Sequence, residues 1–390
     1  MNTRTITTTA DLMQFCATFG DEQFITVDTE FIRERTYFPQ LCLMQVATSK
    51  EAVAIDPIAG PDMDLTPLYD AFADERLVKV FHACGQDIEI FVKESGRVPF
   101  PLYDTQIAAM VCGYGESISY ENLVMDVVGA SLDKASRFTD WARRPLSDRQ
   151  LVYALDDVIH LRVIYETLKA QIEEDGRSEW ITEEMNDLAD ITKYRVDANR
   201  AWKRLKVKSR SPEVLNILRA AASWREEMAA KKDVPRQRVL KDDYVVQIAM
   251  QLPESVEQLL EVRGIQGQLG REMMASLVEA LHTARMAPKD TFPQPEEREK
   301  PMQAAQEACL DQLKLLLRQK AEDYHTVPRL VADKEELEAV VRGKLPLEKA
   351  HFGHGWRYEI FGRAAQDLLT GKLTAKVVPL RGGYGLVWQA

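Results

Sequence analysis

The sequence predicts an α/β domain with a mixed sheet, followed by two small all-α domains. Strand-like runs of apolar and β-branched residues alternate with helical spacing over residues 1–171, which is typical of an α/β domain. Beyond this point strand signals almost vanish, and two clusters of helical spacing follow. A chain of 390 residues, 45% of them hydrophobic, is long enough to give two or three domains full cores.

The first domain begins with strands. Apolar or β-branched runs separated by polar turns predict three strands that form a meander, at 24–27, 41–47 and 51–56. A similar run predicts a fourth strand at 77–82. Helices are expected where apolar residues recur with a helical period, at 86–94, 105–111, 122–128 and 147–172. Asp104 and Ser147 stand at the starts of two of these helices and are good N-cap residues. This order predicts a mixed sheet with helices packed against it.

Composition divides the rest of the chain. Residues 172–210 are rich in charge with a helical period, and we expect a connecting helix that leads into a basic stretch. The helical clusters at 211–287 and 300–373 are separated by a proline-rich linker, 288–299. The tail, 374–390, carries a Gly-Gly pair around which a small hairpin can form.

The two helical clusters share a short motif. Val234-Pro235-Arg236 in the first cluster recurs as Val327-Pro328-Arg329 in the second. Each tripeptide follows a long predicted helix and precedes an acidic helix start. A tripeptide alone can recur by chance, but the matched surroundings predict an internal duplication.

Composition also limits location and partners. No run of about 18 apolar residues occurs and the N-terminus lacks the apolar core of a signal peptide, so we expect a cytoplasmic protein without membrane contact. The five cysteines lack C-x-x-C spacing, which argues against a disulfide framework or a zinc knuckle. The net charge of −11 disfavours nucleic acid, yet residues 195–245 hold 14 Lys and Arg against 7 Asp and Glu. A nucleic-acid partner therefore stays open.

Acidic side chains fall where a metal site can be built. Asp28 and Glu30 are two residues apart in an expected strand and point to the same face. Asp87 lies in the first turn of an expected helix, and Tyr153 and Asp157 share one helix face. Adjacent carboxylates repel one another unless a cation lies between them. Taken singly, each acid also fits a solvated strand edge, helix-dipole compensation or an ordinary surface position.

These five residues together resemble the three exonuclease motifs of the DEDD superfamily in its tyrosine-bearing branch. The motifs read Asp28-x-Glu30, then Asp87 within H-A-x-x-x-D, then Tyr153-x-x-x-Asp157. Three further stretches resemble the bacterial ribonuclease D family, at 27–45, 139–141 and 144–146. The helical clusters resemble HRDC domains, so the resemblance spans nearly the whole chain.

The resemblance implies a fold and an activity. The first domain is expected to be a ribonuclease H-like mixed sheet with helices, and the helical clusters are expected to be two HRDC-like domains. The implied enzyme is a 3′→5′ exoribonuclease that releases 5′-mononucleotides and matures transfer RNA 3′ ends. Its expected partner is RNA with a free 3′ end, such as a transfer RNA precursor, and the protein is expected to be a monomer.

The donor set fits two divalent cations. Carboxylate oxygens suit Mg²⁺ or Mn²⁺, and four of them can hold two such ions about 3.5–4 Å apart. We assign Asp28 as the bridging ligand, Glu30 and Asp157 to the first ion, and Asp87 to the second ion through water. One ion would acidify the attacking water and the other would stabilise the leaving 3′ oxygen. Tyr153 is expected to orient the water.

Six further side chains are candidate substrate contacts: Phe31, Gln45, His82, Thr105, Arg143 and Arg144. Phe31 and His82 are candidates for the terminal base and a phosphate, and the two arginines for a phosphate clamp. Each also fits a structural role, as a core aromatic, a strand or cap residue, or a solvated cation. His351 and His354 lie in a glycine loop without further ligands and are interpreted as structural or surface residues.

Two other functions remain open. The first is the same chemistry on DNA, because no residue recognisably reads the 2′-hydroxyl group. The second is a non-catalytic nucleic-acid-binding protein on the same fold, which predicts the loss of at least one acid, and none is lost. We expect the helical clusters and the basic segment 195–210 to hold the RNA body.

Overall fold

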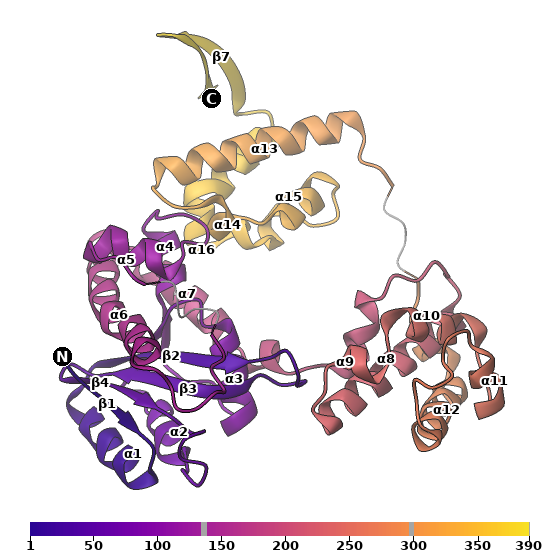
Figure 1. Ribbon diagram of the computed structural model, residues 1–390. Coiled ribbons are helices and arrows are strands. Elements are labelled where there is room, and N and C mark those ends of the chain that lie inside the picture. Colours follow the sequence, from indigo (N-terminus) through magenta and orange to yellow (C-terminus); the bar gives the residue numbers. More distant parts are fainter. Residues whose placement is uncertain (134–138, 296–299, 390) are drawn as a thin grey trace.

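A mixed sheet of six strands forms the central layer of the first domain in the computed structural model, which describes residues 1–133, 139–295 and 300–389 (Figure 1). The strands lie in the order β1-β4-β3-β2-β5-β6. They are β1 (Asn2–Ile6), β2 (Phe24–Ile32), β3 (Gln40–Ala47), β4 (Glu51–Ile55), β5 (Val78–Phe81) and β6 (Leu102–Asp104). The predicted meander is confirmed, since β2, β3 and β4 pair antiparallel while β1, β5 and β6 join in parallel.

The strands β1 and β6 are absent from the sequence prediction. Four of the five residues of β1 are exposed, so the segment lacks the apolar run of a buried strand. β6 has three residues, too few to show a period. Both lie at edges of the sheet, where pairing with one neighbour holds a strand.

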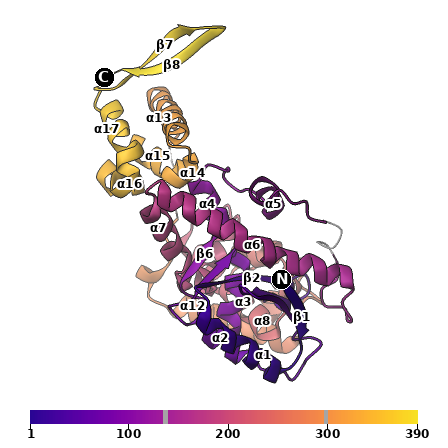
Figure 2. The ribbon, with the colours of Figure 1, turned by 90° about the vertical axis from the view of Figure 1, so that its left-hand side faces the viewer.

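Helices pack against this sheet. They are α1 (Thr9–Cys16), the 3₁₀ helix η1 (Ala17–Asp21), α2 (Thr66–Phe72), α3 (Gly85–Ser95), α4 (Thr105–Val111), α5 (Tyr120–Val128) and α6 (Asp148–Glu174). Both predicted N-caps are confirmed: Asp104 accepts from backbone N–H groups of α4, and Ser147 forms a capping box with Gln150. The long helix α6 lies over β2, where Thr26 Oγ1 donates to the Val158 carbonyl over 2.7 Å (Figure 2). This bond fixes α6 above the strand that carries Asp28 and Glu30.

The predicted single connecting helix is wrong. After α6, Gly176 adopts the left-handed conformation with φ of 68°, and the chain forms α7 (Ser178–Leu188) and the 3₁₀ helices η3 (Ile191–Tyr194) and η4 (Ala198–Arg204). The side chains of Asp190 and Asp197 cap η3 and η4. Aspartate favours such local caps over a helix interior, so the helical period is divided into short turns.

Two helical units follow. The first contains α8 (Pro212–Lys232), α9 (Arg236–Val239), α10 (Asp242–Gln251), α11 (Val256–Glu261) and α12 (Arg271–Met286). The second contains α13 (Ala304–Asp323), α14 (Pro328–Val331), α15 (Lys334–Val341), η6 (Leu347–Lys349), η7 (His351–Gly353), α16 (Gly355–Arg357), the π-helix η8 (Tyr358–Gly362) and α17 (Arg363–Leu369). Neither unit contains a strand among its described residues.

The linker and the tail complete the chain. The predicted linker contains η5 (Lys289–Thr291), and its residues 296–299 lie outside the described part. The tail forms the predicted hairpin, in which β7 (Thr374–Leu380) pairs antiparallel with β8 (Gly383–Gln389). Within the described residues, no helix is both long enough and apolar enough to cross a membrane.

The second helical unit is joined to α7 of the connector, and through a shared apolar cluster to the first domain, by buried contacts. The indoles of Trp180 and Trp356 stack with ring centroids 4.3 Å apart. Arg357 is 2% exposed and donates to Glu183 over 2.6 Å, and it also contacts Glu184. Apolar side chains of both parts belong to one continuous buried cluster. The second unit and the first domain therefore share a core.

The first helical unit is attached by polar contacts at the β2–β3 loop. Tyr37 Oη donates to Glu226 over 2.8 Å, and Asp233 accepts from the backbone N–H groups of Tyr37 and Phe38 at 3.1 Å. The apolar side chains of this unit form a separate core. Its attachment therefore depends mainly on hydrogen bonds at one loop and on the connector.

Candidate metal centre

Three carboxylates come together above the centre of the sheet. Asp28 and Glu30 lie on one face of β2, and Asp157 reaches them from α6. Each offers a carboxylate oxygen, and these oxygens lie within 4.8 Å of one another. The side-by-side position of Asp28 and Glu30 follows from the period of a strand. That Asp157 joins them depends on the packing of α6 over β2.

The fourth predicted acid lies beside this group. Asp87 stands in the first turn of α3, is 7% exposed and accepts a hydrogen bond from Thr29 Oγ1. Burial raises the pKa of Asp87, and the charge of Asp28 raises it further. Asp87 is therefore electrostatically coupled to the three-residue group, although its oxygens lie outside it.

Burial and mutual repulsion make this cluster unfavourable for several negative charges. The pKa of Glu30 is raised to about 10, first by burial and then by the charges of Asp28 and Asp157. Burial and Asp157 likewise raise the pKa of Asp28 well above its usual range. A bound divalent cation removes this penalty, and an all-carboxylate donor set is the type that Mg²⁺ and Mn²⁺ prefer. The residues present thus fit divalent metal ions.

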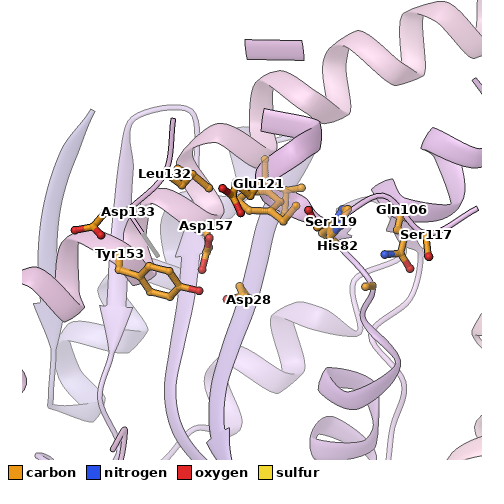
Figure 3. A pocket seen from close by; sticks show the side chains of 13 residues that line it. Asp28, His82, Gln106, Ser117, Ser119, Glu121, Leu132, Asp133, Tyr153 and Asp157 are labelled. Carbon is orange, nitrogen blue, oxygen red and sulfur yellow. The ribbon is translucent and has the colours of Figure 1, made fainter. Parts of the chain in front are cut away.

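A cavity of about 400 Å³ opens beside the cluster. Asp28, Asp157 and Tyr153 form one wall, and Figure 3 shows the Tyr153 side chain pointing toward the two acids. His82 and Gln106 lie on the opposite side (Figure 3). The volume lies within the range of small-molecule sites, so the cavity can take a ligand of that size.

His82 lines the cavity but is held by the protein. Its Nδ1 lies 3.0 Å from Thr105 Oγ1, and its Nε2 lies 3.2 Å from the Ile118 carbonyl. Burial lowers the pKa of His82, so the ring is a poor cationic partner for a phosphate. Phe31 is half-buried against the core and does not line this cavity. The predicted substrate contacts of His82 and Phe31 stay predictions.

Three other predicted substrate contacts, Gln45, Thr105 and Arg144, are turned into the protein, and their roles toward substrate stay predictions. Gln45 and Thr105 have no exposed surface. Arg144 is turned inward, where it donates to Asp56 over 2.6 Å and to the Cys42 carbonyl over 2.7 Å. Thr105 and Arg144 thus have partners inside the fold, whereas both amide atoms of Gln45 are buried without a partner among the described residues. Arg143 is exposed and its predicted role stays a prediction.

The two histidines of the glycine loop have structural partners. His351 Nε2 lies 3.2 Å from Glu183, at the junction between the second helical unit and α7. His354 Nδ1 lies 2.9 Å from the His351 carbonyl. Their positions fit the structural interpretation made from the sequence.

Helix α5 contributes a wall of the cavity that the sequence does not predict. Tyr120 donates to the Asp156 carbonyl over 3.1 Å, and its ring packs edge-on against His82. Ser119, the N-cap of α5, and Glu121 also line the cavity. The N-cap predicts where α5 begins, but no local pattern predicts that this helix lies over the acids.

The chain is similar in sequence to two known families and to known proteins. The 3′-5′ exonuclease family matches residues 3–173, and the HRDC domain family matches residues 214–281. The chain is 44% identical over 380 residues to ribonuclease D of Jannaschia sp., across 95% of this chain and 96% of that protein. It is 41% identical over 374 residues to ribonuclease D of Zymomonas mobilis, across 95% of each.

Two solved structures share the overall fold. Escherichia coli RNase D, described as an exoribonuclease involved in structured RNA processing, has a TM-score of 0.79 and 29% identity, across 95% of this chain and 99% of that chain. A protein from Bifidobacterium adolescentis has a TM-score of 0.70 and 20% identity, across 94% of this chain and 97% of that chain. The arrangement of the α/β domain and the helical units thus recurs over nearly the whole length.

Proposed function

Because the chain belongs to the ribonuclease D family, we propose that this 3′→5′ exoribonuclease removes 5′-mononucleotides from RNA 3′ ends by two-metal hydrolysis. The observation that carries the mechanism is the group of three carboxylates, whose oxygens lie within 4.8 Å of one another beside a cavity. The raised pKa values of Asp28 and Glu30 indicate a site that is incomplete without a cation.

Each acid has a role in this proposal. Asp28 interacts electrostatically with each of the other acids and would hold both ions. Glu30 and Asp157 would hold the first ion, and Asp87 would hold the second through water. When bound, the ions supply an acidified water and stabilise the leaving 3′ oxygen. Thr29 Oγ1 orients the Asp87 carboxylate by its hydrogen bond. Loss of Asp28 should therefore cost both ions.

Tyr153 is proposed to position the attacking water. Its side chain enters the cavity from α6, one turn before Asp157, and points toward the acids (Figure 3). A phenol hydroxyl both donates and accepts hydrogen bonds, which suits it to orient a water rather than to take its proton. This role is the one expected in the tyrosine-bearing branch of the superfamily.

We propose that transfer RNA precursors are the substrate and that both helical units are HRDC-like. The relative from Escherichia coli is described as acting in structured RNA processing, which supports a folded RNA substrate. In both units the Val-Pro-Arg tripeptide follows the longest helix and leads into a helix of four residues, α9 or α14. This correspondence supports duplication of one domain.

A direct assay tests the activity. The purified protein is incubated with a 3′-extended transfer RNA precursor and with RNA and DNA oligonucleotides of matched sequence, in Mg²⁺, Mn²⁺ or EDTA. We expect 5′-mononucleotides from RNA in either metal and none in EDTA. Equal rates on DNA would favour a nuclease of broader substrate range, and nucleotide release in EDTA would exclude metal catalysis.

Substitutions test the assigned ligands. Asp28→Asn and Asp157→Asn should each abolish metal-dependent release, because an amide replaces a charged ligand. Asp62→Asn is the matched control, since Asp62 is an exposed acid of the same domain away from the cavity. Full activity in either ligand variant would refute the assignment.

A further inference from the structure

A second cavity, about 590 Å³ in volume, lies along the connector between η4 and α8. We call it the connector groove; it is lined by residues 202–203 and 205–210 with Leu215, Gln294 and Pro295. Four of these side chains are cationic: Lys203, Lys206, Lys208 and Arg210. Among the described residues that line the groove, none is acidic. The groove is thus a positive surface on a chain with a net charge of −11.

The three lysines of the groove have no ionic partner among the residues that the structure describes. Lys203, Lys206 and Lys208 are exposed, and none of them forms an ion pair or a side-chain hydrogen bond within the part of the chain that the structure describes. Other cations nearby are paired: Arg225 contacts Asp242 at 2.7 Å and Arg236 contacts Glu226 at 3.4 Å. The positive charge of Lys203, Lys206 and Lys208 therefore stays available for an external anion.

The backbone arranges these charges in a row. After η4 the chain runs without helix or strand through residue 211, and Leu205 has extended angles, φ −91° and ψ 127°. Exposure alternates along the segment: Lys206, Lys208 and Arg210 are exposed, while residues 207 and 209 are half-buried. Alternate side chains of an extended chain point the same way, about 6–7 Å apart. The row of cations matches a linear polyanion better than a single small anion.

We infer that the connector groove binds the phosphate backbone of an RNA strand outside the catalytic cavity, with a base stacked on Trp202. Trp202 is half-buried and lines the groove beside Lys203, so part of its ring is open to a ligand. Cationic grooves with an aromatic platform are the common means of holding single strands without sequence preference. The inference rests on the proposed function for its choice of RNA.

Binding to a long single-stranded RNA tests the inference. We compare the full-length protein with a groove variant, Lys203→Gln, Lys206→Gln and Lys208→Gln, each in an Asp28→Asn background so that RNA is not degraded. Loss of about three phosphate contacts should lower affinity at least tenfold and reduce the slope of log K against log salt by about 2. The control, Lys300→Gln, Lys372→Gln and Lys376→Gln, changes exposed lysines elsewhere by the same charge. Equal losses in groove and control variants would overturn the inference.

Two further measurements identify the ligand class. Trp202→Leu should weaken binding to RNA but not to inorganic polyphosphate, because only RNA offers a base to stack. Poly-glutamate of comparable charge should compete poorly. Equal competition by poly-glutamate, or equal loss of RNA and polyphosphate binding in the Trp202 variant, would refute an RNA site and favour an acidic protein or a fold defect.

A last comparison separates this inference from the proposed function. In the active background, the groove variant should cleave a short oligoribonucleotide at the wild-type rate, because such a substrate fits the catalytic cavity alone. Loss of that cleavage in the groove variant would place the lysines in catalysis and contradict the inference. If the wild-type protein failed to cleave RNA at all, the proposed function would fail, while the binding comparison would still decide the groove.

Discussion

The metal-free protein should lose stability as the pH rises from 6 to 8, and divalent metal should abolish this loss. The perturbation is the removal of cations from the cluster of Asp28, Glu30 and Asp157 with EDTA. The pKa of Glu30 is raised to about 10 in the folded protein, whereas an unfolded glutamate ionises near 4.3. Between these values the folded state binds more protons than the unfolded state, so the free energy of unfolding falls with rising pH.

The magnitude follows from linkage. A proton that is bound in the folded state but not in the unfolded state lowers the free energy of unfolding by about 1.4 kcal/mol for each unit of rising pH. Glu30 would therefore lower it by about 2.7 kcal/mol between pH 6 and 8. Water in the adjoining cavity screens part of this contribution, which leaves roughly 1–2.5 kcal/mol. For a domain of this size the melting temperature should fall by roughly 2–10 °C. Asp28 and Asp87, whose pKa values burial also raises, add in the same direction.

One buried base opposes this effect. Burial lowers the pKa of Lys79 to about 7, so above that pH the folded state binds fewer protons at Lys79 and stability rises with pH. The Lys79 ammonium donates to the carbonyls of Asp74 and Leu77 over 3.0 and 2.7 Å, and it also contacts the Phe100 carbonyl. The quantity to measure is therefore the difference between the wild-type protein and Glu30→Gln, which leaves Lys79 unchanged.

The assay is thermal unfolding across pH 6–8 in EDTA and in saturating Mg²⁺. Glu30→Gln carries a neutral side chain of the same shape and should show a shallower loss of melting temperature with pH in EDTA. In Mg²⁺ the wild-type melting temperature should stay level or rise, because metal binding needs ionised carboxylates. The reasoning is refuted if the two proteins have the same pH dependence in EDTA, or if Mg²⁺ leaves the wild-type curve unchanged.

Three more substitutions probe single features. Tyr153→Phe should lower kcat by about 10²-fold with little change in KM, measured by steady-state kinetics, because only the position of the attacking water is lost; an unchanged kcat would remove Tyr153 from the site. Gln45→Leu should raise the free energy of unfolding by about 1–3 kcal/mol in denaturant titrations, since both amide atoms of Gln45 are buried without partners among the described residues; a decrease would mean that the amide has a partner. Trp356→Ala should cost about 3–5 kcal/mol by the same titration and expose α7 to limited proteolysis, because Trp356 is 7% exposed and stacks on Trp180; resistance equal to the wild-type protein would contradict the shared core.

The parts of the site that were predictable are those set by local spacing. The i and i+2 positions of Asp28 and Glu30 on a strand, and the i and i+4 positions of Tyr153 and Asp157 on a helix, follow from the period of each element. The burial of a side chain is less predictable, because it depends on which distant segments pack over it. Arg144 looks like an exposed cation in the sequence, yet its partner Asp56 lies 88 residues away along the chain. No local pattern shows that this arginine turns inward.

The fold was predictable to a similar extent. The meander, the caps at Asp104 and Ser147 and the terminal hairpin follow from turn and cap chemistry. The connector was not, because a helical period in a charged segment is compatible both with one helix and with short turns capped by Asp190 and Asp197. In the structure the local caps prevail over continuation of the helix, so the connector contains short 3₁₀ helices.

The two helical units differ in how firmly they are attached to the α/β domain. The second unit shares a buried cluster with the α/β domain and is clamped by Arg357, so moving it would expose apolar surface and a buried charge. The first unit keeps its own core and is held by hydrogen bonds around Tyr37, which water can replace at small cost. If the protein adapts to RNAs of different shape, we therefore expect the first unit to be the part that moves. The connector groove lies where that unit begins, so a strand bound there would be held at the junction between the catalytic domain and the part best able to move.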